Sequence, residues 1–347
     1  MRIGVLTIFG VPNYGAILQS YALSRYLLDK GFETHVVNYR PPAIKQLYAF
    51  KLSFPPNFWH WLRLRRCARF VEGCLPLDGR EKSLAELTSK ISSFDTLIAG
   101  SDQVWFTGPV QYYEPAFFLD FPAFSGRRIS YAASAGGSTT FQPFMEQVSQ
   151  ALARFNHVGV RDSHTASLVQ SVTPTPLTEN VDPVFLSTFD ELIARESPHS
   201  EPYILLFGNF SGASAELVTR VATATGIKSV VSLQYQCPTA THRVPSPCPK
   251  QWLSWFKHSA FVITSYFHGA AIAVKFNRPF LAIPTPGRRL KVNTMLEPLG
   301  LAERCLSDPL APEAGEIAKR KINWVEANAR LQLKIQESEE YLKRALA

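Results

Sequence analysis

Short apolar runs that end in small and polar residues recur along this chain, and a helical stretch follows most of them. The first run covers residues 2–9, and after a loop at 10–15 come a predicted helix at 16–30 and a strand at 34–38. This β-α-β order predicts a parallel sheet with right-handed crossovers. Further strands are expected at residues 95–99, 128–132, 157–160, 203–207, 229–233, 261–264 and 280–283. The repetition favours an α/β fold with two Rossmann-like, doubly wound parallel-sheet domains that face a cleft.

The domain boundary is expected where prolines interrupt the pattern. A chain of 347 residues fits two domains of ordinary size. We predict an N-terminal domain at residues 1–175 and a linker at 176–202. A C-terminal domain follows at 203–312, and charged helices at 313–347. The linker is placed by prolines in and beside it: Pro174, Pro176, Pro183, Pro198 and Pro202.

The composition of the chain limits the kinds of ligand and the cellular compartment that can be expected. The formal charge of +8 favours anionic partners, but no long Lys/Arg run or nucleic-acid module appears, so no nucleic acid is expected. The five cysteines form no CxxC pair, and we therefore expect neither a metal site nor a disulfide framework. Residues 1–10 lack the pattern of a signal peptide, and the apolar stretch at 260–276 contains His268 and Lys275. A cytoplasmic protein is predicted.

Unusual polar residues gather where the predicted strands end. Ligands of open parallel sheets bind beyond the carboxyl ends of the strands, so this placement indicates a binding site. The candidate site residues are Asn13, Gly15, Ser101, Asp102, Ser134, Arg161, Ser265, His268, Arg288 and Arg289.

Two candidates in the first half each have a structural alternative. The loop at residues 10–15 precedes a helix N-terminus, which favours an anion, but it also fits a tight turn with Asn13 buried. Asp102 follows an apolar strand and can act as a general base or hydroxyl ligand, or can cap the next helix. The sequence leaves both alternatives open.

The cationic candidates suit an acidic ligand. Arg161 offers a planar fork for a carboxylate or phosphate, or it forms a structural pair with a nearby acid. His268 is expected in the first turn of a helix, facing the strand ends, as an acid, a base or a phosphate ligand. Arg288 and Arg289, with Lys291, are predicted in a basic loop that binds substrate or is simply solvated.

Residues 54–71 read as a basic amphipathic helix. On a helical wheel Trp61, Leu64, Cys67, Ala68 and Val71 share one arc, and Arg63, Arg65, Arg66 and Arg69 share the opposite arc. Such a helix indicates peripheral contact with the inner face of the plasma membrane. An ordinary packed helix with a solvated basic face is the alternative.

At these positions the chain resembles the polysaccharide pyruvyl transferase family. The matching pieces occur in the family's order from residue 3 to about residue 305. Departures are Phe106, where Asn is common, and Ala135, where Phe is common. The pieces include Asn13-Tyr14-Gly15-Ala16, Gly100-Ser101-Asp102-Gln103-Val104-Trp105, Tyr131-Ala132-Ala133-Ser134, Val160-Arg161-Asp162-Ser163, Val181-Asp182-Pro183 and Ser265-Tyr266-Phe267-His268-Gly269.

The resemblance implies a GT-B-like fold, phosphoenolpyruvate as donor, and Arg161 and His268 as residues that hold it. It also makes the N-terminal domain at 1–175 the expected acceptor side and the C-terminal domain at 203–312 the expected donor side. The acceptor is then a saccharide, either a polysaccharide or its lipid-linked precursor, which receives a pyruvate ketal. We assign His268 to phosphate binding or proton donation and Asp102 to the base. No cofactor or metal is expected, because cationic side chains can balance the donor's charge.

Two other functions stay open. A sugar-nucleotide-dependent GT-B glycosyltransferase usually holds the ribose with an acidic residue, and residues 269–276 contain no Glu or Asp. A non-catalytic partner in polysaccharide assembly would not need cations and carboxylates at the strand ends. Both observations favour the pyruvyl transferase.

Overall fold

The computed structural model describes residues 1–48, 58–108 and 112–347, which form two compact units. Unit 1 comprises Met1–Lys51, Cys67–Thr188 and Leu333–Ala347, and unit 2 comprises Leu52–Arg66 and Phe189–Gln332. Helices α3 (Phe58–Cys74) and α12 (Trp324–Leu346) therefore each contribute residues to both units. The domain boundaries predicted from the sequence do not divide either of these helices between two domains.

Unit 1 is built on a parallel sheet with the strand order β2-β1-β3-β4. Two further strands, β5 and β6, pair in parallel, and isolated bridges from Ile129 to His157 and from Ala133 to Val160 join them to the edge of β4. All four residues of β3 are buried, which is why this strand reads as a continuous apolar run. The strands are β1 (Arg2–Leu6), β2 (Glu33–Val36), β3 (Thr96–Ala99), β4 (Arg127–Ser130), β5 (Val158–Val160) and β6 (Leu177–Glu179).

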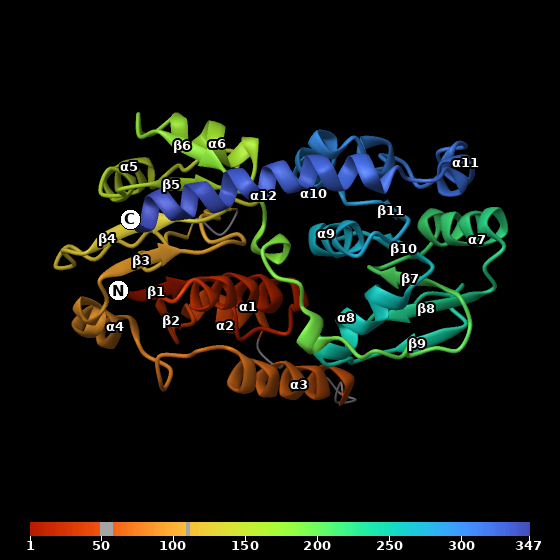
Figure 1. Ribbon diagram of the computed structural model, residues 1–347, viewed down its shortest axis with the longest axis horizontal. Coiled ribbons are helices and arrows are strands. Elements are labelled where there is room, and N and C mark those ends of the chain that lie inside the picture. The colour runs from red at the N-terminus through yellow and green to blue at the C-terminus, as the bar shows by residue number, and fades with distance from the viewer. Residues whose placement is uncertain (49–57, 109–111) are drawn as a thin grey trace. The chain divides into compact units, whose positions relative to one another are not determined.

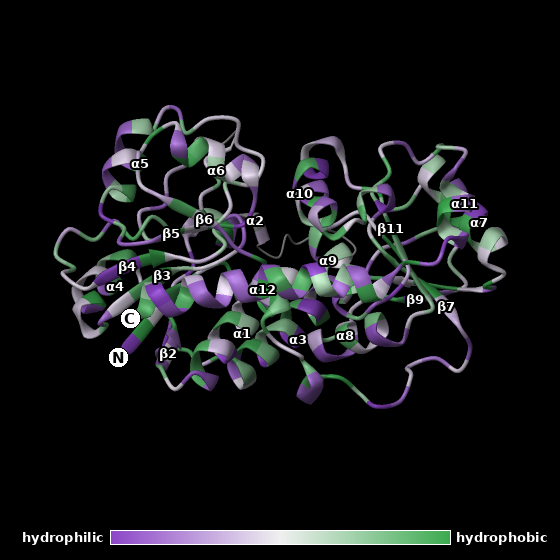
Figure 2. Cartoon of the chain, turned by 45° about the horizontal axis from the view of Figure 1, so that its top comes forward, coloured by the Kyte–Doolittle hydropathy of each residue, from purple (hydrophilic) through white to green (hydrophobic). Residues whose placement is uncertain are grey.

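Helices cover both faces of the unit 1 sheet (Figure 1). Ile98 of β3 packs on one face with α1 (Tyr14–Asp29) and the last turns of α12. Its neighbours Leu97 and Ala99 face the other core, with α4 (Leu84–Lys90), α5 (Met145–Leu152) and α6 (Ser163–Gln170). In Figure 2 α12 alternates between hydrophilic and hydrophobic segments, as an amphipathic covering helix should.

Unit 2 contains a second parallel sheet, with the strand order β11-β10-β7-β8-β9. One core joins β7 and β10 to α7 and α11, and on the other face Phe207 packs against Trp252 and Phe256 of α8. The strands are β7 (Tyr203–Phe207), β8 (Ser229–Leu233), β9 (His242–Val244), β10 (Phe261–Thr264) and β11 (Phe280–Ala282). The helices are α7 (Ala213–Thr225), α8 (Pro249–His258), α9 (Phe267–Lys275), α10 (Pro286–Leu296) and α11 (Ala314–Lys319).

Every strand predicted from the sequence is confirmed to within a few residues, but the predicted basic loop is wrong. The basic loop at residues 288–291 is part of α10, whose first position is Pro286, because proline suits the first helical turn. The chain passes from unit 1 to unit 2 after Thr188, within the predicted linker, and the part of the linker before this point contains β6 and a short 3-10 helix, η2. The remaining short helices are α2 (Pro42–Tyr48), η1 (Ile91–Ser93), η2 (Pro183–Phe185), η3 (Asp190–Leu192), η4 (Glu297–Leu299) and η5 (Ala302–Arg304).

Helix α3 exposes a different face from the one that the helical wheel predicts. Its buried residues are Cys67, Phe70 and Val71, whereas Trp61 and Ala68 are exposed. The four arginines also divide: Arg65 and Arg69 are exposed, whereas Arg63 and Arg66 are half-buried and Arg66 donates to the carbonyl of Ser246 in unit 2. Residues 54–57 of the predicted segment lie outside the described residues. None of the helices that the structure describes is long and apolar enough to cross a membrane.

Candidate functional site

A buried ion pair lies at the carboxyl ends of the unit 1 strands. Arg161 directly follows β5, and its Nη1 lies 2.9 Å from Oδ2 of Asp182, with side-chain exposures of 4% and 0%. The Oγ of Ser101, after β3, donates to the same carboxylate oxygen at 3.3 Å. Burial lowers the pKa of Arg161, but Asp182, Asp102 and Asp162 outweigh it and raise the pKa overall. The predicted residues Ser101, Asp102 and Arg161 are thus brought together around Asp182.

Asp102 adopts a left-handed backbone conformation, with φ of +75°. Its Oδ1 accepts a hydrogen bond from the backbone N–H of Gln103 at 2.9 Å, and turns rather than a helix follow it. The interpretation as a helix cap is therefore wrong. A non-glycine residue with positive φ at a strand end is typical of functional sites, so the geometry is compatible with the base that the sequence predicts.

Ser134, Asn13 and Gly15 have local structural partners. The Oγ of Ser134 donates to Asp162 at 2.8 Å, and Asp162 caps α6 by accepting from the N–H of Thr165. Asn13 caps α1 by accepting from the N–H of Ala16 at 3.3 Å, and Gly15 is buried in the first turn of that helix. These bonds hold the loops at the strand ends in place, and a role in substrate binding stays a prediction.

In unit 2 the connection from β10 to α9 carries Ser265 and His268. Ser265 is half-buried beside the end of β7, where a Cβ on Gly208 would lie only 2.3 Å from the serine Oγ. Gly208 also has φ of +156°, so this close approach requires glycine. His268 is the second residue of α9 and is 9% exposed. Its predicted position in the first helical turn is confirmed.

The two predicted arginines of unit 2 differ in their surroundings. Arg288 is exposed, and its guanidinium carbon lies 5.0 Å from the ring centre of Tyr266. Arg289 is half-buried and donates to the carbonyl of Ser307 at 3.0 Å. Arg288 is therefore the one of the pair that lies beside the β10–α9 connection.

Sequence reasoning missed the pairs that join distant segments. It gave no role to Asp182, although the segment Val181-Asp182-Pro183 was part of the resemblance. It also missed Tyr235 and Tyr266, whose hydroxyl oxygens lie 2.6 Å apart after β8 and β10. Arg161 and His268 belong to different units, and their predicted joint contact with one donor stays a prediction.

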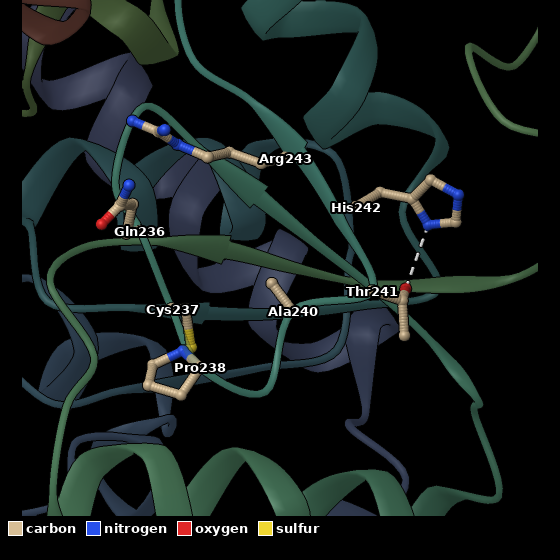
Figure 3. Close-up of a pocket in the computed structure, with 7 residues that line it drawn as sticks. All are labelled: Gln236, Cys237, Pro238, Ala240, Thr241, His242 and Arg243. Atoms are coloured by element: carbon tan, nitrogen blue, oxygen red, sulfur yellow. Dashed lines mark hydrogen bonds between the residues drawn. The ribbon is translucent and has the colours of Figure 1, made fainter.

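A surface pocket of about 380 Å³ lies elsewhere in unit 2 (Figure 3). Its lining residues come from the segment that follows β8 and enters β9, and the side chains of His242 and Arg243 point in opposite directions. None of the predicted site residues lines it. The lining residues are Gln236, Cys237, Pro238, Ala240, Thr241, His242 and Arg243. Within the described ranges, no cluster of three or more His, Cys, Asp or Glu side chains is placed to hold a metal ion.

Comparison with known proteins identifies one family. The family model described as polysaccharide pyruvyl transferase matches residues 13–286, which is most of the chain and includes most of the candidate residues. No curated protein matches the sequence.

Solved structures resemble the fold at low sequence identity. UDP-GlcNAc 2-epimerase from Neisseria meningitidis, bound to UDP-GlcNAc, has a TM-score of 0.54 and 10% identity over 99% of this chain and 100% of that chain. A Streptomyces sp. SF2575 glycosyltransferase complexed with thymidine diphosphate has a TM-score of 0.51 and 12% identity over 100% of both chains. The epimerase from Methanocaldococcus jannaschii has a TM-score of 0.50 and 8% identity over 96% of this chain and 93% of that one. The fold is thus GT-B-like, with two Rossmann-like units.

Proposed function

Because this chain belongs to the polysaccharide pyruvyl transferase family, we propose that it transfers the enolpyruvyl group of phosphoenolpyruvate to a saccharide as a cyclic ketal. The observation that carries this proposal is the family match over residues 13–286. The GT-B-like fold alone does not select a donor, since similar folds occur in epimerases and glycosyltransferases.

The reaction needs an acid, a base and several cations. Protonation of C3 makes C2 of the donor electrophilic, and one sugar hydroxyl then attacks C2 while a base accepts its proton. Phosphate leaves from C2, and a second hydroxyl of the sugar adds to close the ketal. The products are the ketal and inorganic phosphate, so neither a redox partner nor a further co-reactant is required.

The unit 2 residues supply groups of the right kind for the donor. His268 and Arg288, with the hydroxyl of Ser265, follow β10 and β11, where ligands of parallel sheets bind. Helix α9 contains no acidic residue to repel the donor or to hold a nucleotide ribose. We assign His268 to phosphate binding or proton donation.

The unit 1 residues suit a different part of the reaction. Asp102 is the candidate base, held by its left-handed backbone at the end of β3. Arg161 forms a buried ion pair with Asp182, whose carboxylate also accepts a hydrogen bond from Ser101. If Arg161 contacts the donor, it must do so while this ion pair stays in place. We therefore propose that Arg161 places positive charge near the reacting groups while Asp182 fixes its orientation.

Donor titration tests this proposal most directly. Calorimetry should show that phosphoenolpyruvate binds, whereas UDP- and GDP-sugars do not. His268→Ala should weaken donor affinity by roughly ten- to hundredfold, as expected for the loss of a contact to a charged group. Binding of a nucleotide sugar without any response to phosphoenolpyruvate would favour the glycosyltransferase instead. Donor binding without phosphate release, whichever acceptor is offered, would indicate a non-catalytic partner.

We propose further that the acceptor is lipid-linked and that α3 contacts the inner membrane surface. Phe58, Trp59 and Trp61 are 55%, 45% and 41% exposed, which is unusual for three aromatic side chains in one helical turn. The guanidinium of Arg65 lies 5.0 Å from the Trp61 ring centre, and Arg69 is exposed one turn further on. Aromatic rings flanked by arginine suit an anionic bilayer interface. A cytoplasmic location at this surface follows from the proposal.

Vesicle sedimentation tests the membrane contact. Binding to vesicles rich in phosphatidylglycerol should exceed binding to pure phosphatidylcholine vesicles. The double variant Arg65→Gln/Arg69→Gln should lose roughly tenfold or more of that binding, because each cation near an anionic surface contributes about 1 kcal/mol. Arg25→Gln/Arg243→Gln removes the same charge elsewhere and is the control. Equal binding by both double variants would refute the contact.

A further inference from the structure

A tyrosine pair spans the carboxyl end of the central strand of unit 2. Tyr235 lies two residues after β8, and Tyr266 lies two residues after β10, with β7 between these strands. Their hydroxyl oxygens are 2.6 Å apart, and their rings stack with centres 6.0 Å apart at 26°. β7 ends in Phe207, whose ring packs against that of Tyr266 with the centres 5.1 Å apart.

The hydroxyl pair can donate to an external oxyanion. One tyrosine donates its proton to the other, and the acceptor tyrosine keeps its own O–H for a third group. Burial is the main reason that the pKa of Tyr235 lies above its usual value, so its hydroxyl stays protonated at neutral pH and can donate. Both rings are only half-buried, which leaves the hydroxyls within reach of a ligand.

Two arginines flank this pair. The guanidinium of Arg288 lies over the Tyr266 ring at 5.0 Å, and the positive charges of Arg63 and Arg288 both act on Tyr235. Arg63 belongs to α3, whose first turns are held on unit 2 because Ser246 donates to the carbonyl of Trp59 and accepts from Arg66. The Nη2 of Arg63 lies 2.9 Å from Nδ1 of His60, whose pKa is lowered by burial and by Arg63 itself. His60 is therefore neutral at pH 7 and can accept a hydrogen bond from Arg63 without changing its charge.

We propose that Arg63, Tyr235, Tyr266 and Arg288 form the phosphoryl-binding part of the unit 2 ligand site. Two cations and a tyrosine hydroxyl donor suit the oxygens of a phosphate group, which carry charge and accept hydrogen bonds. The adjoining N-terminus of α9 favours the same ligand, since the Tyr266 side chain does not cap it. For phosphoenolpyruvate as the ligand, this inference rests on the proposed function. It adds three residues to those that the sequence predicts.

Calorimetry with phosphoenolpyruvate, inorganic phosphate and UDP-GlcNAc tests the assignment. Arg63→Gln should weaken phosphoenolpyruvate binding roughly tenfold or more, and Tyr235→Phe should weaken it about three- to tenfold. Lys250→Gln, which removes an exposed charge from α8 of the same unit, should leave the affinity within twofold of wild type. Tyr235→Phe keeps the ring, so its effect reports the hydroxyl even if Arg63→Gln perturbs folding.

The outcomes separate this inference from the proposed function. Wild-type binding of phosphoenolpyruvate with unchanged affinity in both variants overturns the inference and leaves the proposed function standing. Binding of UDP-GlcNAc but not phosphoenolpyruvate, with loss in both variants, overturns the proposed function and supports the phosphoryl site. If wild-type protein binds none of the three probes, both proposals are overturned.

Discussion

Replacing Asp182 by asparagine should destabilise unit 1, because the change removes the charge that faces Arg161. The Asp182 carboxylate is fully buried and accepts from Arg161 at 2.9 Å, from Ser101 at 3.3 Å and from the N–H of Val184 at 3.1 Å. Breaking a buried ion pair on one side costs about 3–5 kcal/mol. Asp102 and Asp162 still face the guanidinium, so we expect the low end, about 3 kcal/mol.

Urea denaturation followed by circular dichroism measures this change. With an m value of about 2 kcal/mol/M, the midpoint of unit 1 should fall by about 1.5 M. Hydrogen exchange at β3 and β5 should locate the loss in unit 1. Asp29→Asn is the matched control, since Asp29 pairs with Arg25 on the surface and such pairs contribute at most about 1 kcal/mol.

A double-mutant cycle completes the test. Arg161→Met/Asp182→Asn removes both charges, so its cost should be clearly smaller than the sum of the two single costs. A loss of under about 1 kcal/mol in Asp182→Asn, or additive single costs, would refute the reasoning. These variants change the stability of the fold. Their donor affinities should therefore be compared with that of the wild type only in the absence of urea, where each variant is folded.

Three further predictions follow from buried groups. Asp102→Asn should retain phosphoenolpyruvate binding but lose phosphate release; normal turnover would show that Asp102 is not the base. Burial lowers the pKa of Lys275 to about 8; between pH 8 and about 10.4 the unfolded chain binds more protons, so the free energy of unfolding rises with pH there. Lys275→Met should abolish this rise in denaturation curves, and an unchanged pH profile would contradict it. Tyr341→Phe removes the hydroxyl that donates to the carbonyl of Ser130 at 2.6 Å and should cost about 1–3 kcal/mol in urea denaturation; an unchanged midpoint would exclude a structural role for this bond.

The strands could be predicted because their burial is visible in the sequence. Tyr203–Phe207 is buried along its whole length and consists of five consecutive apolar residues, as is typical of a strand that is covered on both faces. The polar residues that follow them could also be placed, since parallel strands end at one edge. The sequence therefore sufficed to predict that Ser101, Asp102 and His268 lie at the carboxyl ends of strands.

Partners across the chain could not be predicted, because no local pattern encodes them. Arg161 follows β5 and Asp182 follows β6, so the pairing of these two strands brings the ion pair together. The prolines around β6 indicated a linker instead of a strand. Tyr235 and Tyr266 meet because β7 separates their strands by one position in the sheet. The arginines of α3 differ in exposure because Arg66 donates to the carbonyl of Ser246. Ser246 lies far away in the sequence, so a helical wheel of α3 cannot predict this contact.

The return of α12 to unit 1 affects how the protein can mature during translation. Tyr341, Leu342 and Ala345 belong to the core that covers Ile129 of β4, although some two hundred residues separate them in the chain. A ribosome therefore synthesises the whole of unit 2 before it synthesises the segment that closes unit 1. A nascent chain stalled near residue 330 would expose the apolar face of β4, with Val181 still lacking its hydrogen bond to Ser338. Unit 1, although most of it is synthesised first, is therefore completed last, and its exposed apolar face is prone to aggregation until then.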